Sequence, residues 1–169
     1  MTSDELHPFW WCDIQLYVGQ LQLDVFEAKA FQLRAADWSG MTFTVQKSRV
    51  PGEIVGHARS GALHAYLVVG LAELCLLLRK HGAPHDAPLG TYQEIPSGPL
   101  CYIKSSDTTK ALKSAARLHG AEFCIGLDDV SAGCLRSTGA MAMFCGGVDS
   151  SPIRLLGRWQ SWTMLRYLH

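Results

Sequence analysis

SAGCLRSTGAMAMFCGGVDSSPIRLLGRWQSWTMLRYLH, residues 131–169, contains the start and stop signals of three successive helices. Small polar residues that favour a helix N-cap stand at three places, and glycines that favour a helix end follow the first two. In chain order the signals are Ser131 before a helix through Met143–Cys145 that stops at Gly146-Gly147, Ser151 with Pro152 at the first helical position and Gly157 as the stop, and Ser161 before a helix that carries Tyr167. The chain is therefore predicted to end in a helical region.

Two more helices are predicted upstream of this region. Leucines at three- and four-residue intervals form one apolar face, at positions Leu63, Leu67, Leu71, Leu74 and Leu78. This helix is expected to stop at Gly82, with Pro84 just beyond. The next helix starts with Ser105 or Ser106 as its cap and ends at Gly120. Its inward residues are predicted to be Ala111, Leu112, Ala115 and Ala116.

The N-terminal part of the chain is predicted to contain short strands. Residues 9–16 and 20–26 fit two strands around a turn at Gly19. Residues 42–46 alternate in polarity, and a Pro51-Gly52 turn signal leads into residues 53–57, which together predict a β-hairpin. The Gly- and Pro-rich stretch 81–99 is interpreted as loops. The predicted fold is α+β and mainly helical, with a small antiparallel sheet or hairpin followed by a helical bundle in one domain, residues 1–169.

Composition narrows the classes of protein to which the chain can belong. Of its 169 residues 48% are apolar and 18% charged, and 15 basic residues balance 15 acidic ones, which is an ordinary globular profile. Any basic surface for nucleic acid must therefore be local. The six cysteines are scattered without a C-x-x-C pair, so no zinc site is predicted. No secretory signal follows Met1 and the longest apolar run is interrupted by charge, which predicts an intracellular protein without a membrane span.

Two segments of the C-terminal region have a spacing that indicates chemistry. The first is C-L-R-S-T-G-A at residues 134–140, which contains Arg136. The second is L-L-G-R-W at residues 155–159, in which Arg158 precedes Tyr167 by nine residues. An upstream F-T-V-Q-K segment places Lys47 just before the Pro-Gly turn of the predicted hairpin.

This pattern resembles the catalytic domain of the tyrosine recombinases of phage-integrase type. Members of that family carry an H-x-x-R box, then an L-G-H or L-G-W box, then a nucleophilic tyrosine nine residues after that His or Trp. The longer run from Ser137 to His169 is especially similar to recombinase-like proteins of eukaryotic mobile elements, where L-G-R-W replaces L-G-H. The segment before the Pro-Gly turn resembles the hairpin that presents the family's catalytic lysine. The specific part of the resemblance is the C-terminal region.

The resemblance implies DNA recombination and integration through a covalent phosphotyrosine intermediate. Tyr167 would be the nucleophile, Arg136 and Arg158 would stabilise the charged transition state, and Lys47 would protonate the departing 5′ oxygen. Arg154 and Trp159 are predicted to contact the DNA. The implied partner is double-stranded DNA, on which the chain would assemble as a homo-oligomer, with a nuclear location in a eukaryotic host. No metal and no cofactor is required.

Departures from the family pattern keep the enzyme assignment open. Gly133 stands at the position of the box histidine, and no substitute is found for the family's first arginine, because Arg34 lies on the wrong side of the predicted strands. A degenerate or N-terminally truncated catalytic domain is therefore expected. The alternatives are a non-catalytic DNA-binding or interaction remnant, and a fragment without function that folds incompletely. Taken singly, a tyrosine at the position of Tyr167 is usually packed or half-exposed, and Trp159 and Trp162 are consistent with packed residues. Arg136 and Arg158 alone would most often be solvated surface charges, and Arg154 is equally consistent with a solvated helix edge.

Overall fold

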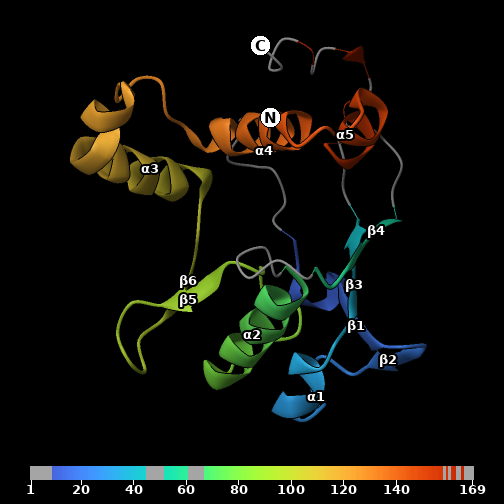
Figure 1. Cartoon of the computed structure of the whole chain (residues 1–169). Helices are drawn as coiled ribbons and strands as arrows, with labels where there is room; N and C mark the ends of the chain where they lie inside the picture. The colour runs from blue at the N-terminus through green and yellow to red at the C-terminus, as the bar shows by residue number, and fades with distance from the viewer. Residues whose placement is uncertain are drawn as a thin grey trace. The chain divides into compact units, whose positions relative to one another are not determined.

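The computed structural model describes residues 9–44, 52–60, 67–157, 159, 161–162 and 165. The chain divides into two compact units, Met1–Ile103 and Lys104–His169, here called the N-terminal and C-terminal units (Figure 1). The first contains a sheet with helices and the second is helical, so the prediction of an α+β fold with a small antiparallel sheet is confirmed. The single-domain prediction for residues 1–169 stays a prediction.

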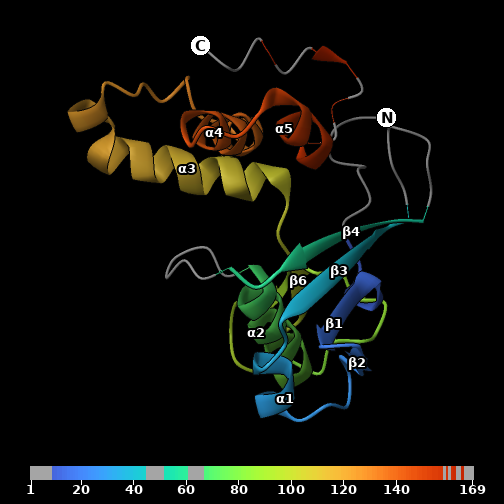
Figure 2. The same cartoon turned by 45° about the vertical axis from the view of Figure 1, so that its right-hand side comes forward.

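The N-terminal unit is built on a four-stranded antiparallel sheet in the order β2-β1-β3-β4 (Figure 2). Its elements, in chain order, are a 3-10 turn (Trp11–Asp13), β1 (Ile14–Val18), β2 (Leu21–Leu23), α1 (Ala30–Arg34), β3 (Trp38–Phe43), β4 (Glu53–Ala58), α2 (Leu67–Lys80), β5 (Thr91–Gln93) and β6 (Leu100–Tyr102). The predicted pairing of the first two strands around Gly19 and the predicted hairpin before and after the Pro-Gly turn are confirmed as β1–β2 and β3–β4. The predicted bounds are wrong in part, because Trp11–Asp13 form a 3-10 turn and β3 begins already at Trp38.

Helix α2 covers one face of this sheet and supplies much of the core. Residues at helical spacing are buried on its inner side, namely Val68, Leu71, Ala72, Cys75 and Leu78. They pack against Ile14 and Leu16, which point to the same face of β1 because alternate strand residues do. The leucine periodicity therefore predicted the inner face correctly at Leu71 and Leu78, but Leu67 is 45% exposed and the prediction is wrong there. Gly82 follows the helix end with a φ of +60°. Residues 63–66, where this helix was expected to begin, lie outside the described residues.

A guanidinium at the end of α2 ties this helix to the connection between β2 and α1. Arg79 donates from Nε and Nη2 to the carbonyl oxygen of Val25 at 3.1 and 2.7 Å, and from Nη1 to that of Ala28 at 2.6 Å. Backbone carbonyls in such a connection need partners when they leave water. One arginine thus satisfies two of them from a distant part of the chain.

The interpretation of residues 81–99 as loops is wrong in part, because this stretch contributes a strand to a second sheet. Strands β5 and β6 pair antiparallel, with Thr91 opposite Tyr102 and Gln93 opposite Leu100. Gln93 donates to the Gly98 carbonyl oxygen at 3.2 Å inside the hairpin, and its Oε1 lies 2.8 Å from Nδ1 of His81. Three-residue strands are too short to show a period of two in the sequence.

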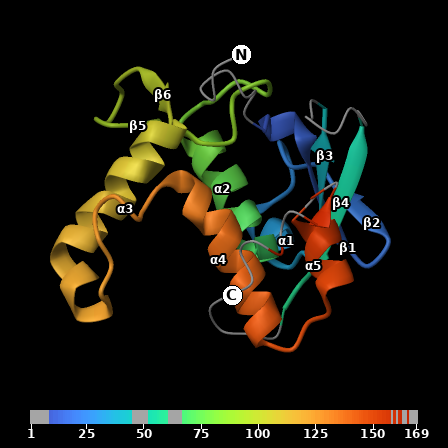
Figure 3. The same cartoon turned by 90° about the horizontal axis from the view of Figure 1, so that it is seen from above.

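The C-terminal unit consists of α3 (Ser105–His119), a 3-10 turn (Gly120–Phe123), α4 (Ala132–Cys145) and α5 (Ser150–Leu156). Packing joins α3 to α4 and α4 to α5 (Figure 3). Thr109 of α3 accepts a hydrogen bond from the Ala132 backbone at 3.0 Å, which links α3 to the start of α4. Among the described residues of this unit the buried core is small and consists of Ala140 and Ile153, with Met143 and Trp159 packed against them.

Several predicted details of these helices need correction. No residue of α3 is buried, and Ala111 and Ala115 are exposed, so the predicted inward face of α3 is wrong for these two. The N-cap of α3 is Lys104, whose backbone N–H donates to the Asp107 carboxylate at 3.0 Å. Helix α5 is capped by Asp149 rather than Ser151, so Pro152 stands at its third position. Ser131 as the N-cap of α4 and Gly157 as the end of α5 are confirmed.

Candidate functional site

Four side chains of the C-terminal unit form what we call the arginine–tryptophan cluster: Arg136, Arg154, Trp159 and Trp162. Arg136 lies in the second turn of α4, Arg154 lies in α5, and the two tryptophans follow α5 in the chain. The contact between α4 and α5 brings these segments together across more than twenty residues of sequence (Figure 3).

Arg136 is held on two sides by residues of the L-G-R-W motif. Its Nε donates to the carbonyl oxygen of Gly157 at 3.1 Å, and its Nη2 donates to the same oxygen. Its guanidinium carbon lies 4.4 Å from the centre of the Trp159 ring, which is a cation–π contact. The two residues that flank position 158 in the chain therefore both contact Arg136.

Gly157 is required at its position by the Trp159 ring. A Cβ at residue 157 would lie 1.5 Å from the Cζ3 atom of Trp159, which is far inside van der Waals contact. The backbone at Gly157 is right-handed helical, so its conformation would admit other residues, and the indole alone excludes them. The Trp159 backbone N–H donates to the Arg154 carbonyl oxygen at 3.0 Å, which closes the turn after α5.

Arg154 makes the second cation–π contact of the cluster. Its guanidinium carbon lies 4.9 Å from the centre of the Trp162 ring. Trp162 remains 48% exposed, so this pair lies at the surface. The cluster thus consists of two arginine–indole pairs, Arg136 with Trp159 and Arg154 with Trp162.

The predicted site residues divide between described and undescribed parts of the chain. The structure brings together Arg136, Arg154 and Trp159. Tyr167, Arg158 and Lys47 lie outside the described residues, and their roles stay predictions. The contact of Trp162 with Arg154 was not predicted, because α5 ends at Leu156 and helical spacing does not extend from Arg154 to Trp162.

Gly133, at the position of the box histidine, has room for a Cβ atom. A Cβ there would meet only the Ser131 Oγ atom, at an ordinary contact distance of 3.5 Å. Packing among the described residues therefore does not demand glycine at this position. The two glycines differ sterically, because a Cβ at residue 157 would meet the Trp159 ring and a Cβ at residue 133 would not. They also differ chemically, because a histidine at 133 would bring a proton donor to the start of α4.

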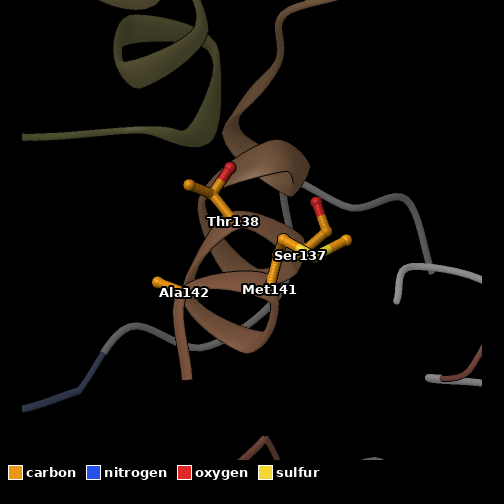
Figure 4. A pocket seen from close by; sticks show the side chains of 4 residues that line it. All are labelled: Ser137, Thr138, Met141 and Ala142. Carbon is orange, nitrogen blue, oxygen red and sulfur yellow. The ribbon is translucent and has the colours of Figure 1, made fainter. Parts of the chain in front are cut away.

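A shallow hollow of about 430 Å³ lies on α4, lined among the described residues by Ser137, Thr138, Met141 and Ala142 (Figure 4). At 100° per residue these side chains lie on the side of the helix opposite Arg136. The Ser137 hydroxyl donates to the Cys134 carbonyl oxygen at 2.9 Å, so the helix backbone already engages it. The hollow is therefore separate from the arginine–tryptophan cluster.

Charge is distributed unevenly between the two units. The C-terminal unit contains eight Lys and Arg against five Asp and Glu, and the N-terminal unit contains seven against ten. The basic excess that the balanced composition concealed is thus in the unit that carries the cluster. Within α3, the Lys104 backbone N–H and the nearby Lys110 lower the pKa of the Asp107 carboxyl group.

No family model matches this chain, and no curated protein or solved structure matches it either. In the parts of the chain that the structure describes, no group of His, Cys, Asp and Glu side chains is arranged to hold a metal ion. Among the same residues, no helix is long and apolar enough to cross a membrane.

Proposed function

We propose that this chain acts on DNA as a tyrosine recombinase catalytic domain, cleaving and rejoining a strand through Tyr167. The observation that carries the proposal is the contact of Arg136 with both Gly157 and Trp159. A recombinase-like site needs the box arginine to contact the L-G-R-W segment, and the spacing in the sequence does not guarantee that contact. The packing of α4 against α5 brings the two segments together, and this observation does not depend on the motif resemblance.

In the proposed reaction the Tyr167 hydroxyl oxygen forms a bond to a DNA phosphorus, and the bond from phosphorus to the 5′ oxygen breaks. The tyrosyl proton is lost to solvent, and Lys47 gives a proton to the departing 5′ oxygen. The DNA is left with a 3′ phosphotyrosine link and a free 5′ hydroxyl. Rejoining reverses the same exchange, so the energy of the phosphodiester is kept and no cofactor is consumed.

Arg136 has the chemistry to stabilise this transition state. A guanidinium presents five N–H donors in a planar fork, so one group can bind a backbone carbonyl and a phosphate together. The Gly157 carbonyl and the Trp159 ring fix the plane of that fork. Pre-orientation of a cation toward developing charge is a major source of rate in enzymes. The basic excess of the C-terminal unit supports binding of a polyanion.

The test uses a pool of nicked duplexes of randomised sequence, in which the short strand beyond the nick diffuses away after cleavage. We expect a DNA–protein adduct that survives boiling in detergent, together with a new 5′ hydroxyl that polynucleotide kinase can label. Tyr167→Phe should abolish both signals. An adduct that persists in this variant would refute the assignment of the nucleophile.

A non-catalytic DNA-binding role is the second candidate, and Gly133 favours it. Glycine can neither donate a side-chain hydrogen bond nor transfer a proton at the position where the family has histidine. Loss of one such group commonly costs on the order of a hundredfold or more in rate. Salt-sensitive DNA binding without any adduct from the randomised pool would select this candidate.

A further inference from the structure

Trp162, the more exposed indole of the arginine–tryptophan cluster, has no role in the reaction proposed above. Trp162 leaves 48% of its surface in solvent, and Leu155, which follows Arg154 in the chain, is 70% exposed. Large indole surfaces are costly to leave in water and are enriched where proteins bind ligands.

Packing within the C-terminal unit does not account for Trp162. Among the described residues, the small core takes Trp159 against Ala140 and Ile153 but does not take Trp162. The one ring contact of Trp162 that the structure defines is with the Arg154 guanidinium, at 4.9 Å. The indole is thus oriented by a cation while much of it stays accessible.

An oriented indole beside a guanidinium fits one nucleotide of a nucleic acid. Every base has a π face that stacks on an aromatic ring, and the phosphate of the same nucleotide is an acceptor for arginine. The excess of Lys and Arg over Asp and Glu in the C-terminal unit, which contains the cluster, favours a nucleotide over an apolar peptide as the ligand. In a paired duplex the faces of the bases are covered by their neighbours, so the base that stacks must be unpaired.

We propose that Trp162 stacks on an unpaired base of the DNA substrate while Arg154 binds the phosphate of that nucleotide. This inference rests on the DNA binding in the proposed function and names its substrate class: DNA with an unstacked nucleotide at the cleavage site. The site is joined to the phosphate site through the backbone, since Trp159 donates to the Arg154 carbonyl and also contacts Arg136.

The test compares two fluorescent duplexes of equal length, one fully paired and one with a single unpaired thymidine, by anisotropy titration of the full chain. The wild-type chain should bind the second more tightly. Trp162→Ala should weaken binding to the unpaired substrate by about 5- to 150-fold, the range for one stacked base, and should leave binding to the paired duplex nearly unchanged. Trp162→Phe, which keeps an aromatic face, should retain most of the preference.

Phe144→Ala is the matched control, because Phe144 is also an aromatic residue of the C-terminal unit with 48% exposure. It should change binding to neither duplex. Arg154→Gln should weaken both complexes and reduce the slope of log affinity against log salt by about 0.9, the value for one phosphate contact.

Equal binding of both duplexes by the wild type, or equal losses on both duplexes in Trp162→Ala, would overturn the stacking site and leave the proposed function standing. Absence of binding to either duplex would overturn both proposals. Thermal unfolding of each variant identifies a loss of fold. Should Trp162→Ala fail to fold, Trp162→Phe and Arg154→Gln still carry the test, because a lost preference in the folded phenylalanine variant refutes stacking.

Discussion

Replacing Gly157 by alanine tests whether the contact between α4 and the L-G-R-W segment holds the C-terminal unit together. The added Cβ would lie 1.5 Å from a ring carbon of Trp159, whereas ordinary contact begins near 3.4 Å. The indole must therefore move by about 2 Å, which breaks its fit against Ala140 and Ile153. Forcing extra atoms into packed contacts typically costs about 1–3 kcal/mol. Loss of an exposed cation–π contact with Arg136 adds about 0.5–1 kcal/mol.

Alanine also favours a helical backbone over glycine by about 0.5–1 kcal/mol, so the net loss expected for Gly157→Ala is about 1–3 kcal/mol. Gly139→Ala in α4 is the matched control, because a Cβ at residue 139 meets nothing within 4 Å. The control should gain the same 0.5–1 kcal/mol or so without the steric cost.

Thermal unfolding followed by circular dichroism measures the difference between the two variants. For a chain of this size each kcal/mol shifts Tm by about 2–4 °C, so Gly157→Ala should melt roughly 2–12 °C below the wild type and Gly139→Ala slightly above it. Gly157→Ala should also bind DNA more weakly, since Arg136 loses its orientation. Equal melting temperatures for the two variants would refute the reasoning, because the steric conflict would then have no energetic consequence.

Three further outcomes are expected. Gly133→His adds a proton donor at a position where a Cβ makes only an ordinary contact, and it should raise the rate of adduct formation on the nicked pool by on the order of a hundredfold. An unchanged rate in a folded variant would argue against a recombinase-like site. Arg79→Met should lower the free energy of unfolding, measured by urea titration, by about 2–4 kcal/mol, because the carbonyls of Val25 and Ala28 lose charged donors. The control Lys80→Met, at the exposed neighbouring position, should stay within about 0.5 kcal/mol of the wild type. Similar losses in both variants would contradict a stabilising role for the Arg79 hydrogen bonds. Burial raises the pKa of the Cys75 thiol from 9.0 to about 11, so the contribution of this thiol to stability is complete below pH 9 and is lost as pH rises toward 11. The loss in the free energy of unfolding should reach about 2–3 kcal/mol in the wild type and should be absent in Cys75→Ala. An identical dependence of stability on pH in both proteins would count against the burial of this thiol.

Local signals along the chain were enough for most of the secondary structure. The leucine spacing in α2, the cap at Ser131 and the stops at Gly82 and Gly157 act within one or two helical turns, so they can be recognised without knowledge of the fold. Strands β5 and β6 escaped prediction because three residues do not define a period and because each is stabilised by pairing with the other. The predicted inward face of α3 is wrong at two alanines because no residue of that helix is buried. Alanine is found both inside and outside proteins, so its spacing does not indicate which face of a helix is buried.

The candidate site shows the same division between local pattern and contacts across the chain. The positions of Arg136, Arg154 and Trp159 in a motif are properties of the sequence, since spacing is all that a motif contains. The hydrogen bonds from Arg136 to Gly157, its contact with Trp159 and the pairing of Arg154 with Trp162 needed the tertiary structure. The contacts of Arg136 join segments separated by a helix and a turn, and their geometry depends on how α4 packs against α5, which no local preference encodes. The contact of Arg154 with Trp162 depends on the path of the chain after α5. The same packing explains why Gly157 must be glycine while Gly133 need not be, a difference that two glycines in a sequence cannot express.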